Sequence, residues 1–334
     1  MWNGCPVSPP RNATSDAMKP RILITSRLFD ESFAALEREC EVIRPDRAPF
    51  TPETAAPFLP HIDGLIPTQA FRVTREVIDR SPRLRIVANF GTGTDNIDVA
   101  YATERGVVVA NTPDPVVEPT AELAYGLLLA AARGIVRLDR GVRDGSVRVS
   151  VMRNLGTTLR GKTLGIVGYG RIGQAVARYA HGSAMRILYF NRHPLTADRE
   201  RAQGVCYAPL DRLLAEADFV TLHTPLTEQT RHLIGARELG LMKPTAFLIN
   251  TSRGGVVDER ALTEALRAGR IAGAGLDVFE TEPQIPEELR TLDNVILTPH
   301  AGTATTEARM EMGCRAADNI LRFFRGEPGI TRVN

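Results

Sequence analysis

Gly168-Tyr169-Gly170-Arg171-Ile172-Gly173 stands in the middle of the chain, directly after the apolar run Thr163–Val167. A helical pattern follows over Arg171–Gly182, and a second apolar run follows at Arg186–Phe190. Glycines at this spacing, between a strand and a helix, allow a tight turn and close approach of the backbone to a pyrophosphate. The phosphates then lie at the positive end of the helix dipole. The stretch predicts a dinucleotide-binding unit, and about half of the chain precedes it.

The end of the second apolar run indicates which dinucleotide is bound. Asn191 and Arg192 stand where an NAD site usually carries an acidic residue, about 20 residues past the glycines. An anionic side chain would repel a 2′-phosphate, whereas a guanidinium can pair with one through two hydrogen bonds. We therefore predict NADPH as the preferred cofactor and NADH as the second choice. The alternative interpretation is that Arg192 is a solvated surface residue.

Length and composition are typical of a two-domain globular protein. The chain has 334 residues and a formal net charge of +2. It has no basic stripe that would argue for nucleic-acid binding. Its longest apolar stretch, Leu123–Ala132, is too short to cross a bilayer and predicts a buried helix. Cys5, Cys40, Cys206 and Cys314 lack paired or metal-type spacing, which is typical of thiols in a reducing compartment. We expect a cytoplasmic protein without a metal, a nucleic-acid partner or a membrane partner.

Short apolar runs alternate with helical patterns along the whole chain. Before the glycines, the predicted strands are Ile22–Thr25, Gly64–Ile66, Arg85–Ala88 and Val107–Val109, and the predicted helices are Asp30–Cys40, Thr74–Arg80 and Val99–Arg105. After Phe190, the predicted strands are Phe219–Leu222, Ala246–Ile249, Ala274–Leu276 and Val295–Leu297, and the predicted helices are Leu210–Ala217, Glu259–Ala268 and Thr305–Arg325. This alternation predicts an α/β fold with two doubly wound, Rossmann-like parallel sheets.

Two turns divide the chain into domains. The first is Asn111–Pro115, after which a long helical pattern runs from Pro119 to about Arg143, and the second is Pro299–Gly302. We predict a disordered tail at 1–18, a discontinuous substrate domain at 19–114 and 302–334, and an inserted dinucleotide-binding domain at 115–301. The alternative is two domains in series.

Three chemically distinct side chains follow neighbouring predicted strands of the second domain. Arg253, Glu282 and His300 all stand just past strand ends, which is where ligands bind in open α/β sheets. An arginine can hold a substrate carboxylate, a histidine can exchange a proton near neutral pH, and a carboxylate can orient that histidine. Taken singly, they could be a surface arginine, a turn acid and a buried imidazole. Together they predict a catalytic site.

These segments resemble the D-2-hydroxyacid dehydrogenase family. The matching pieces run in the family's order and extend the resemblance from about Arg21 to Phe324. They are Asn111–Pro113, Glu118–Ala124, Gly168–Gly173, Thr251–Glu259, Gly275–Phe279 and Thr298–His300. The resemblance implies a substrate domain interrupted by a cofactor domain, which agrees with the two turns.

The resemblance also implies roles for individual residues. His300 would give a proton to the substrate oxygen with Glu282 as its partner, and Arg253 would hold the carbonyl and the carboxylate. Backbone N–H groups around Thr92 and Gly93 would cradle the substrate carboxylate. The residues assigned to the cofactor are Gly168, Gly170, Arg171, Ile172, Gly173, Asn191, Arg192, His223, Thr224, Pro225, Thr251, Ser252 and Asp277, of which Asp277 would bond the nicotinamide carboxamide.

Within the family, the Asn191-Arg192 pair resembles the branch of glyoxylate and hydroxypyruvate (2-ketogluconate) reductases that prefers NADPH. That branch often carries a tryptophan shortly after the long helix, whereas this chain has its only tryptophan at Trp2. Thr92 is a second departure, because an aliphatic residue is common there. The resemblance further suggests a homodimer through the long helix and the loop that follows it.

The resulting hypothesis is reduction of a small 2-oxo acid, such as glyoxylate or hydroxypyruvate, to the D-2-hydroxy acid. The alternative from another class is a dinucleotide-sensing interaction protein, like the corepressors that share this fold. Formate oxidation is disfavoured because that related group is expected to place a glutamine where this chain has Glu282.

Overall fold

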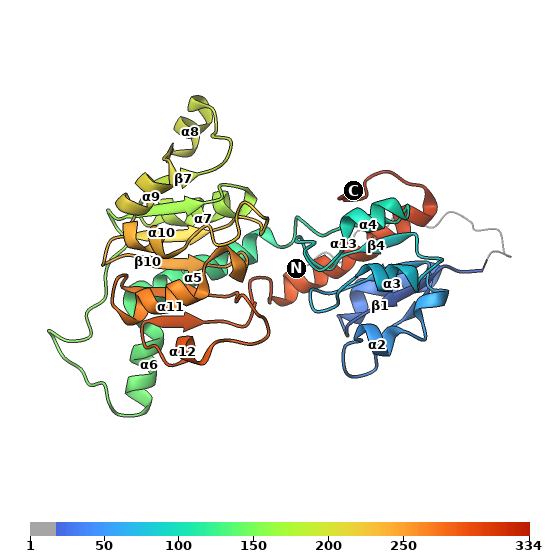
Figure 1. Cartoon of the computed structure of the whole chain (residues 1–334), viewed down its shortest axis with the longest axis horizontal. Coiled ribbons are helices and arrows are strands. Elements are labelled where there is room, and N and C mark those ends of the chain that lie inside the picture. Colours follow the sequence, from blue (N-terminus) through green and yellow to red (C-terminus); the bar gives the residue numbers. More distant parts are fainter. Residues whose placement is uncertain (1–17) are drawn as a thin grey trace. The chain divides into compact units, whose positions relative to one another are not determined.

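The computed structural model describes residues 18–334, which form two compact units (Figure 1). The first unit joins the chain up to Val116 with Ala304–Asn334, and the second unit is Val117–Thr303. Of the tail predicted at 1–18, everything before Met18 lies outside the described residues. In the described part of the chain, no helix combines the length and the apolar character that a membrane span requires.

The first unit is built on a five-stranded parallel sheet of order β2-β1-β3-β4-β5. Its strands are β1 (Arg21–Ile24), β2 (Glu41–Ile43), β3 (Gly64–Ile66), β4 (Ile86–Ala88) and β5 (Val108–Ala110). Its helices are η1 (Asp30–Phe33), α1 (Ala34–Glu39), α2 (Pro52–Ala55), η2 (Leu59–His61), α3 (Arg75–Asp79), α4 (Val99–Glu104) and α13 (Thr306–Arg325). Ala316 and Ile320 of α13 share a core cluster with Ile22 and Ile86, so the last helix completes the core of the first unit.

The second unit contains a seven-stranded parallel sheet of order β12-β11-β10-β9-β6-β7-β8. Its strands are β6 (Thr163–Val167), β7 (Arg186–Phe190), β8 (Val205–Tyr207), β9 (Phe219–Leu222), β10 (Phe247–Asn250), β11 (Gly273–Leu276) and β12 (Val295–Leu297). After β6 the chain builds β7 and β8 on one side and then β9 to β12 on the other. The point where this order reverses lies between β6 and β9, and such switch points are the usual ligand sites of open α/β sheets.

Helices cover both faces of the seven-stranded sheet (Figure 1). They are α5 (Val117–Arg133), α6 (Ile135–Arg143), α7 (Arg171–Gly182), α8 (Ala197–Gln203), α9 (Leu210–Glu216), α10 (Ala236–Leu241), η3 (Gly254–Val256), α11 (Glu259–Arg267) and α12 (Glu287–Arg290). Ile166 packs into a core formed with α5 and α7, whereas its neighbour Val167 packs into a core formed with α9 and α11. Successive side chains of a strand point to opposite faces, which is why β6 is buried along its whole length.

The structure confirms the predicted fold of two doubly wound parallel sheets. The prediction of one helix from Pro119 to about Arg143 is wrong, because Gly134 adopts a left-handed conformation with φ of +62° and separates α5 from α6. The strands β2 and β8 were not predicted. Both are three-residue edge strands with partly exposed side chains, so neither produces a strong apolar run.

The expectation that all four cysteines are thiols is wrong for Cys314, which is disulfide-bonded. Cys40 and Cys206 are free. Burial, together with the charge of Glu39, raises the pKa of the Cys40 thiol to about 12, so this thiol stays protonated at neutral pH.

Candidate active site

The sheet order brings the predicted catalytic residues to one edge of the second unit. Arg253 follows β10, Glu282 follows β11 and His300 follows β12, and these three strands are neighbours in the sheet. Because the strands are parallel, the loops after them emerge at the same edge.

His300 and Glu282 form a direct hydrogen-bonded pair, with 2.8 Å between Nδ1 of the imidazole and Oε2 of the carboxylate. The other carboxylate oxygen, Oε1, accepts the backbone N–H of Phe279 at 3.0 Å. Burial acts to raise the pKa of the Glu282 carboxyl, but these bonds and the charges of His300 and Arg253 hold that pKa below its usual range. An ionised carboxylate can only accept, so the proton on Nδ1 faces Glu282 and Nε2 is left to serve a ligand.

Asp277 organises the loop that carries His300. Its side chain is buried, and Oδ1 accepts the Thr298 hydroxyl at 2.6 Å and the Ala301 N–H at 2.7 Å. Oδ2 accepts the Gly302 N–H at 2.8 Å, and the backbone N–H of His300 donates to the Asp277 carbonyl at 2.8 Å. Burial raises the pKa of the Asp277 carboxyl despite these hydrogen bonds. Oδ2 keeps acceptor capacity, which is compatible with the predicted contact to a carboxamide.

The backbone at His300 has a φ of +53°, a left-handed conformation that a non-glycine residue rarely adopts. Such backbone strain persists only where surrounding contacts hold it, and it occurs preferentially at functional sites. Here the contacts from Asp277 hold it.

Asn250, the last residue of β10, fixes the loop that carries Arg253. Its Oδ1 accepts both the N–H and the hydroxyl of Ser252, at 3.0 and 2.8 Å, and its Nδ2 donates to the Arg253 carbonyl at 3.0 Å. Gly254 then lies against the next strand end, since a Cβ there would be 1.9 Å from the carbonyl carbon of Phe279. No role was predicted for Asn250, although an asparagine at the end of an apolar run is a signal for such a loop.

The glycine stretch forms a cradle at the switch point between β6 and β9. Gly168 has a φ of +93°, and a Cβ on it would be 2.7 Å from the backbone of His223. A Cβ on Gly173 would be 2.4 Å from the Gly168 carbonyl oxygen, whereas a Cβ on Gly170 would meet no atom within 4 Å. The first and third glycines therefore permit close packing, and the second faces open space where a ligand fits.

Three buried polar atoms beside this cradle have no hydrogen-bond partner in the described chain. They are Nδ1 of His223 and the hydroxyls of Thr224 and Thr251, which follow β9 and β10. Burial lowers the pKa of the His223 imidazole to about 3, so the ring is neutral, and its Nε2 lies 2.9 Å from the Thr221 hydroxyl. Unsatisfied buried polar groups are rare in native structures, so these atoms fit a site that a polar ligand such as a dinucleotide completes.

The residues predicted to select the cofactor lie at the end of β7. Asn191 bonds the glycine loop, since its Oδ1 accepts the Tyr169 N–H at 2.7 Å. Arg192 is exposed, and within residues 18–334 it forms neither a hydrogen bond nor an ion pair. The remaining predicted cofactor residues are the exposed Arg171 and half-buried Ile172 at the start of α7, the exposed Pro225 after β9, and the buried Ser252 after β10.

Thr92 and Gly93 lie in the first unit, in a loop after β4. The Gly93 carbonyl accepts from Asn89 at 2.6 Å, and the Thr92 carbonyl accepts from Asn111 at 2.8 Å. The Thr92 hydroxyl donates to the Thr112 carbonyl at 3.2 Å. In the described chain the N–H groups of Thr92 and Gly93 have no acceptor, so they can bind an anion.

Arg309 is a further candidate, which was not predicted from the sequence. It lies on α13 with its guanidinium carbon 5.7 Å from the ring centroid of Phe90, which directly precedes the Thr92 loop. Among residues 18–334 no carboxylate pairs with it, and burial lowers the pKa of its guanidinium. Nothing in its sequence surroundings distinguishes it from the many other arginines of the chain.

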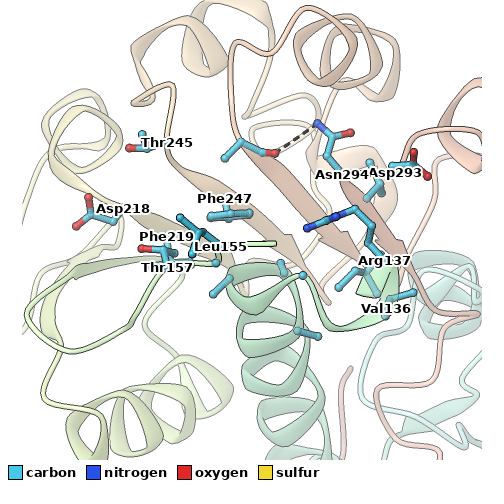
Figure 2. Close-up of a pocket in the computed structure, with 18 of the residues that line it drawn as sticks. Val136, Arg137, Leu155, Thr157, Asp218, Phe219, Thr245, Phe247, Asp293 and Asn294 are labelled. Atoms are coloured by element: carbon cyan, nitrogen blue, oxygen red, sulfur yellow. Dashed lines mark hydrogen bonds between the residues drawn. The ribbon is translucent and has the colours of Figure 1, made fainter. Parts of the chain in front are cut away.

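A separate pocket of about 460 Å³ lies at the opposite edge of the seven-stranded sheet (Figure 2). Asp218, Thr245 and Asn294 line it, and these residues precede β9, β10 and β12. The pocket is therefore remote from His300, which follows its strand. Over the described residues, no group of three or more His, Cys, Asp or Glu side chains could hold a metal ion.

Comparison with known proteins defines the class. Residues 125–302 match the model of the D-isomer specific 2-hydroxyacid dehydrogenase NAD-binding domain. A glyoxylate reductase from Pyrococcus furiosus is 48% identical over 95% of this chain and 96% of its own length. The chain is also similar to the NADPH-dependent glyoxylate/hydroxypyruvate reductase of Sinorhizobium meliloti, solved with NADP and malonate. That match has 35% identity and a TM-score of 0.83 over 94% of this chain and 97% of the other.

Fold and site thus define a dinucleotide-dependent oxidoreductase. More particularly, the chain belongs to the D-isomer specific 2-hydroxyacid dehydrogenase family. This membership favours the enzyme hypothesis over the dinucleotide-sensing alternative.

The three glycines give a testable contrast. Gly170→Ala should leave the fold intact but weaken dinucleotide binding about tenfold or more, because the added methyl group occupies the open face of the cradle. Gly173→Ala should lower the melting temperature, because its Cβ would overlap the Gly168 carbonyl. Gly182→Ala, also in open space, is the control. Titration by dinucleotide fluorescence and thermal unfolding measure both effects. Unchanged binding in Gly170→Ala would contradict the cradle.

Proposed function

We propose that this enzyme reduces glyoxylate, or a similarly small 2-oxo acid such as hydroxypyruvate, to the corresponding D-2-hydroxy acid. The observation that carries the proposal is the His300–Glu282 pair, 2.8 Å apart, with the charge of Arg253 acting on the same carboxylate. The similarity to the glyoxylate reductase of Pyrococcus furiosus supports glyoxylate as the acid. Arg309, a partly buried guanidinium near the Thr92 loop, supports an anionic substrate.

The chain's own residues supply the proton and the charge stabilisation. Glu282 holds Nδ1 of His300, so Nε2 presents a proton to the substrate carbonyl oxygen as negative charge develops there. Arg253 stabilises that charge and orients the carbonyl. The N–H groups of Thr92 and Gly93, in the first unit, can themselves bind a carboxylate. The nicotinamide cofactor, when bound, supplies the hydride for the carbonyl carbon, and the cradle from Gly168 to Gly173 would hold its pyrophosphate.

Replacing the proposed acid tests this assignment. His300→Ala should slow 2-oxo acid reduction by about 10²- to 10⁴-fold, the usual contribution of a general acid. Binding of NADPH should survive, because the cradle residues are unchanged. His61→Ala, at an exposed position of the first unit, is the control and should retain full activity. If His300→Ala kept near-normal kcat in steady-state assays, the assignment of the acid would be wrong.

We also propose that the cofactor preference is for NADPH. Asn191 stands at the end of β7 in place of an acid, and its side chain accepts the Tyr169 N–H. The neighbouring Arg192 is exposed and has no partner in the described chain. A guanidinium in this state can pair with a 2′-phosphate at little cost in competing contacts. The NADP complex of the Sinorhizobium meliloti structure supports this assignment.

Arg192→Ala should raise the KM for NADPH about tenfold or more, because hydrogen bonds to a charged group are lost. The KM for NADH should change little. Arg199→Ala, an exposed arginine of the neighbouring α8, is the matched control. Combining Asn191→Asp with Arg192→Leu should turn the preference toward NADH. If neither variant changes the ratio of kcat/KM values for the two cofactors, the 2′-phosphate is recognised elsewhere.

We propose further that the enzyme is a homodimer through α6 and the segment that follows it. Ten large apolar side chains are strongly exposed among the described residues, and seven of them lie between 129 and 155. They are Leu129, Ile135, Val142, Val149, Val151, Met152 and Leu155. Leu155 also lines the pocket of Figure 2, next to Phe219 and Phe247. Such a concentration of exposed apolar side chains favours a protein interface.

Charged substitutions test the dimer. Val142→Glu combined with Met152→Glu should give monomers in sedimentation velocity, because burying two unpaired carboxylates in an interface is unfavourable. Met18→Glu changes an equally exposed apolar residue outside this segment and should leave the assembly unchanged. A wild-type protein that sediments as a monomer at micromolar concentration would contradict the proposal.

A further inference from the structure

The orientation of Glu282 depends on the turn Phe279–Glu282. One carboxylate oxygen accepts the Phe279 N–H from within that turn, and the other faces His300. A rotation of the Phe279 peptide would therefore misdirect the carboxylate. Whatever fixes the turn also fixes the alignment of the proposed acid with its partner.

Contacts on two sides hold this turn. On one side Gly254 lies so close that a Cβ would be 1.9 Å from the Phe279 carbonyl carbon, so the two loop backbones are in direct contact. On the other side the backbone N–H of Glu280 donates to Oε2 of Glu259 at 3.2 Å. The Glu280 carboxylate is itself 2.6 Å from Nε2 of His232 and 3.3 Å from Nη1 of Arg231.

The segment that presents Arg231 and His232 is anchored at both ends. The backbone N–H of His232 donates to the Gly255 carbonyl at 2.8 Å, and the Thr230 hydroxyl donates to the Pro225 carbonyl at 2.6 Å. His232 has a φ of +51°, so its backbone is held in the left-handed region. This segment is therefore a fixed support for Glu280.

Two carboxylates near Glu280 repel it, and the support from Arg231 and His232 offsets this repulsion. Burial raises the pKa of the Glu259 carboxyl, and the negative charges of Glu280 and Glu282 raise it further. Three carboxylates thus repel one another at this turn. Arg231 and His232 face Glu280, while Arg253 and His300 act on Glu282. The Glu280 side chain is 25% exposed and those of Arg231 and His232 are 59% and 40% exposed, so solvent screens part of this attraction.

We propose that Glu280, held by Arg231 and His232, is a positioning residue that keeps Glu282 directed at Nδ1 of His300. This inference rests on the proposed function. It adds Glu280, Arg231 and His232 to the residues on which turnover depends, although none of them needs to touch the substrate or the cofactor.

A double-mutant cycle tests the proposal. Glu280→Ala, measured in the wild type, should lower kcat about tenfold, a loss typical of a small misplacement of a catalytic group. In a Glu282→Gln background the same substitution should lower kcat less than about twofold, because its effect passes through Glu282. Affinity for NADPH should be unchanged in both backgrounds. Glu228→Ala, an exposed acid on the supporting segment, is the control and should be silent.

The pH profile gives a second readout. Reduction of the 2-oxo acid consumes a proton, so kcat should fall toward alkaline pH. A misaligned Glu282 stabilises the imidazolium less, so Glu280→Ala should move this alkaline limb to lower pH. Arg231→Met combined with His232→Gln removes the support without changing the turn, and should reproduce both effects if Glu280→Ala fails to fold.

The outcomes distinguish a failure of the role proposed for Glu280 from a failure of the proposed function. If Glu282→Gln slows turnover and Glu280→Ala acts as proposed only when Glu282 is present, the inference is supported. Equal effects of Glu280→Ala in both backgrounds, or no effect in the wild type, would overturn the inference and leave the proposed function intact. If Glu282→Gln itself left kcat and its pH profile unchanged, the proposed function would fail and the inference with it.

Discussion

The parallel direction of the seven strands is the constraint on which the site depends. Because β6, β9, β10, β11 and β12 all run the same way, every loop that follows them emerges at one edge of the sheet. The glycine stretch, His223, Arg253, Glu282 and His300 are far apart in the chain, yet all occupy such loops. The reversal of strand order between β6 and β9 then places the dinucleotide cradle at this edge.

Buried charge and buried polar atoms distinguish this edge from the rest of the unit. Asp277 holds the His300 loop with three accepted hydrogen bonds, and Glu282 is held by His300 and by its own turn. The unpartnered hydroxyls of Thr224 and Thr251 remain for a ligand. Groups aimed in advance at developing charge need little rearrangement during the reaction, which is the usual origin of electrostatic catalysis. The proposed role of Glu280 is of the same kind, because it would fix the direction of Glu282 before the reaction begins.

Much of this architecture could be predicted from the sequence because strand ends are visible as apolar runs followed by polar residues. The fold was predicted on that basis and the family from the resemblance of the motifs, and both are confirmed. The break between α5 and α6 at Gly134 was not predicted, because a glycine with positive φ leaves the apolar periodicity of the sequence unchanged. Side-chain partners such as Asn250 and Glu280 were not predicted, since a hydrogen bond between distant loops leaves no local pattern. Cytoplasmic location and NADPH preference stay predictions.

The central claim is that this chain reduces a small 2-oxo acid with NADPH. Initial rates of NADPH and NADH oxidation by the purified protein, with glyoxylate, hydroxypyruvate, pyruvate and 2-ketogluconate, test it most directly. The account predicts the highest kcat/KM with NADPH and either glyoxylate or hydroxypyruvate. Absence of turnover with all four acids and both cofactors, in a protein that demonstrably binds the dinucleotide, would contradict it.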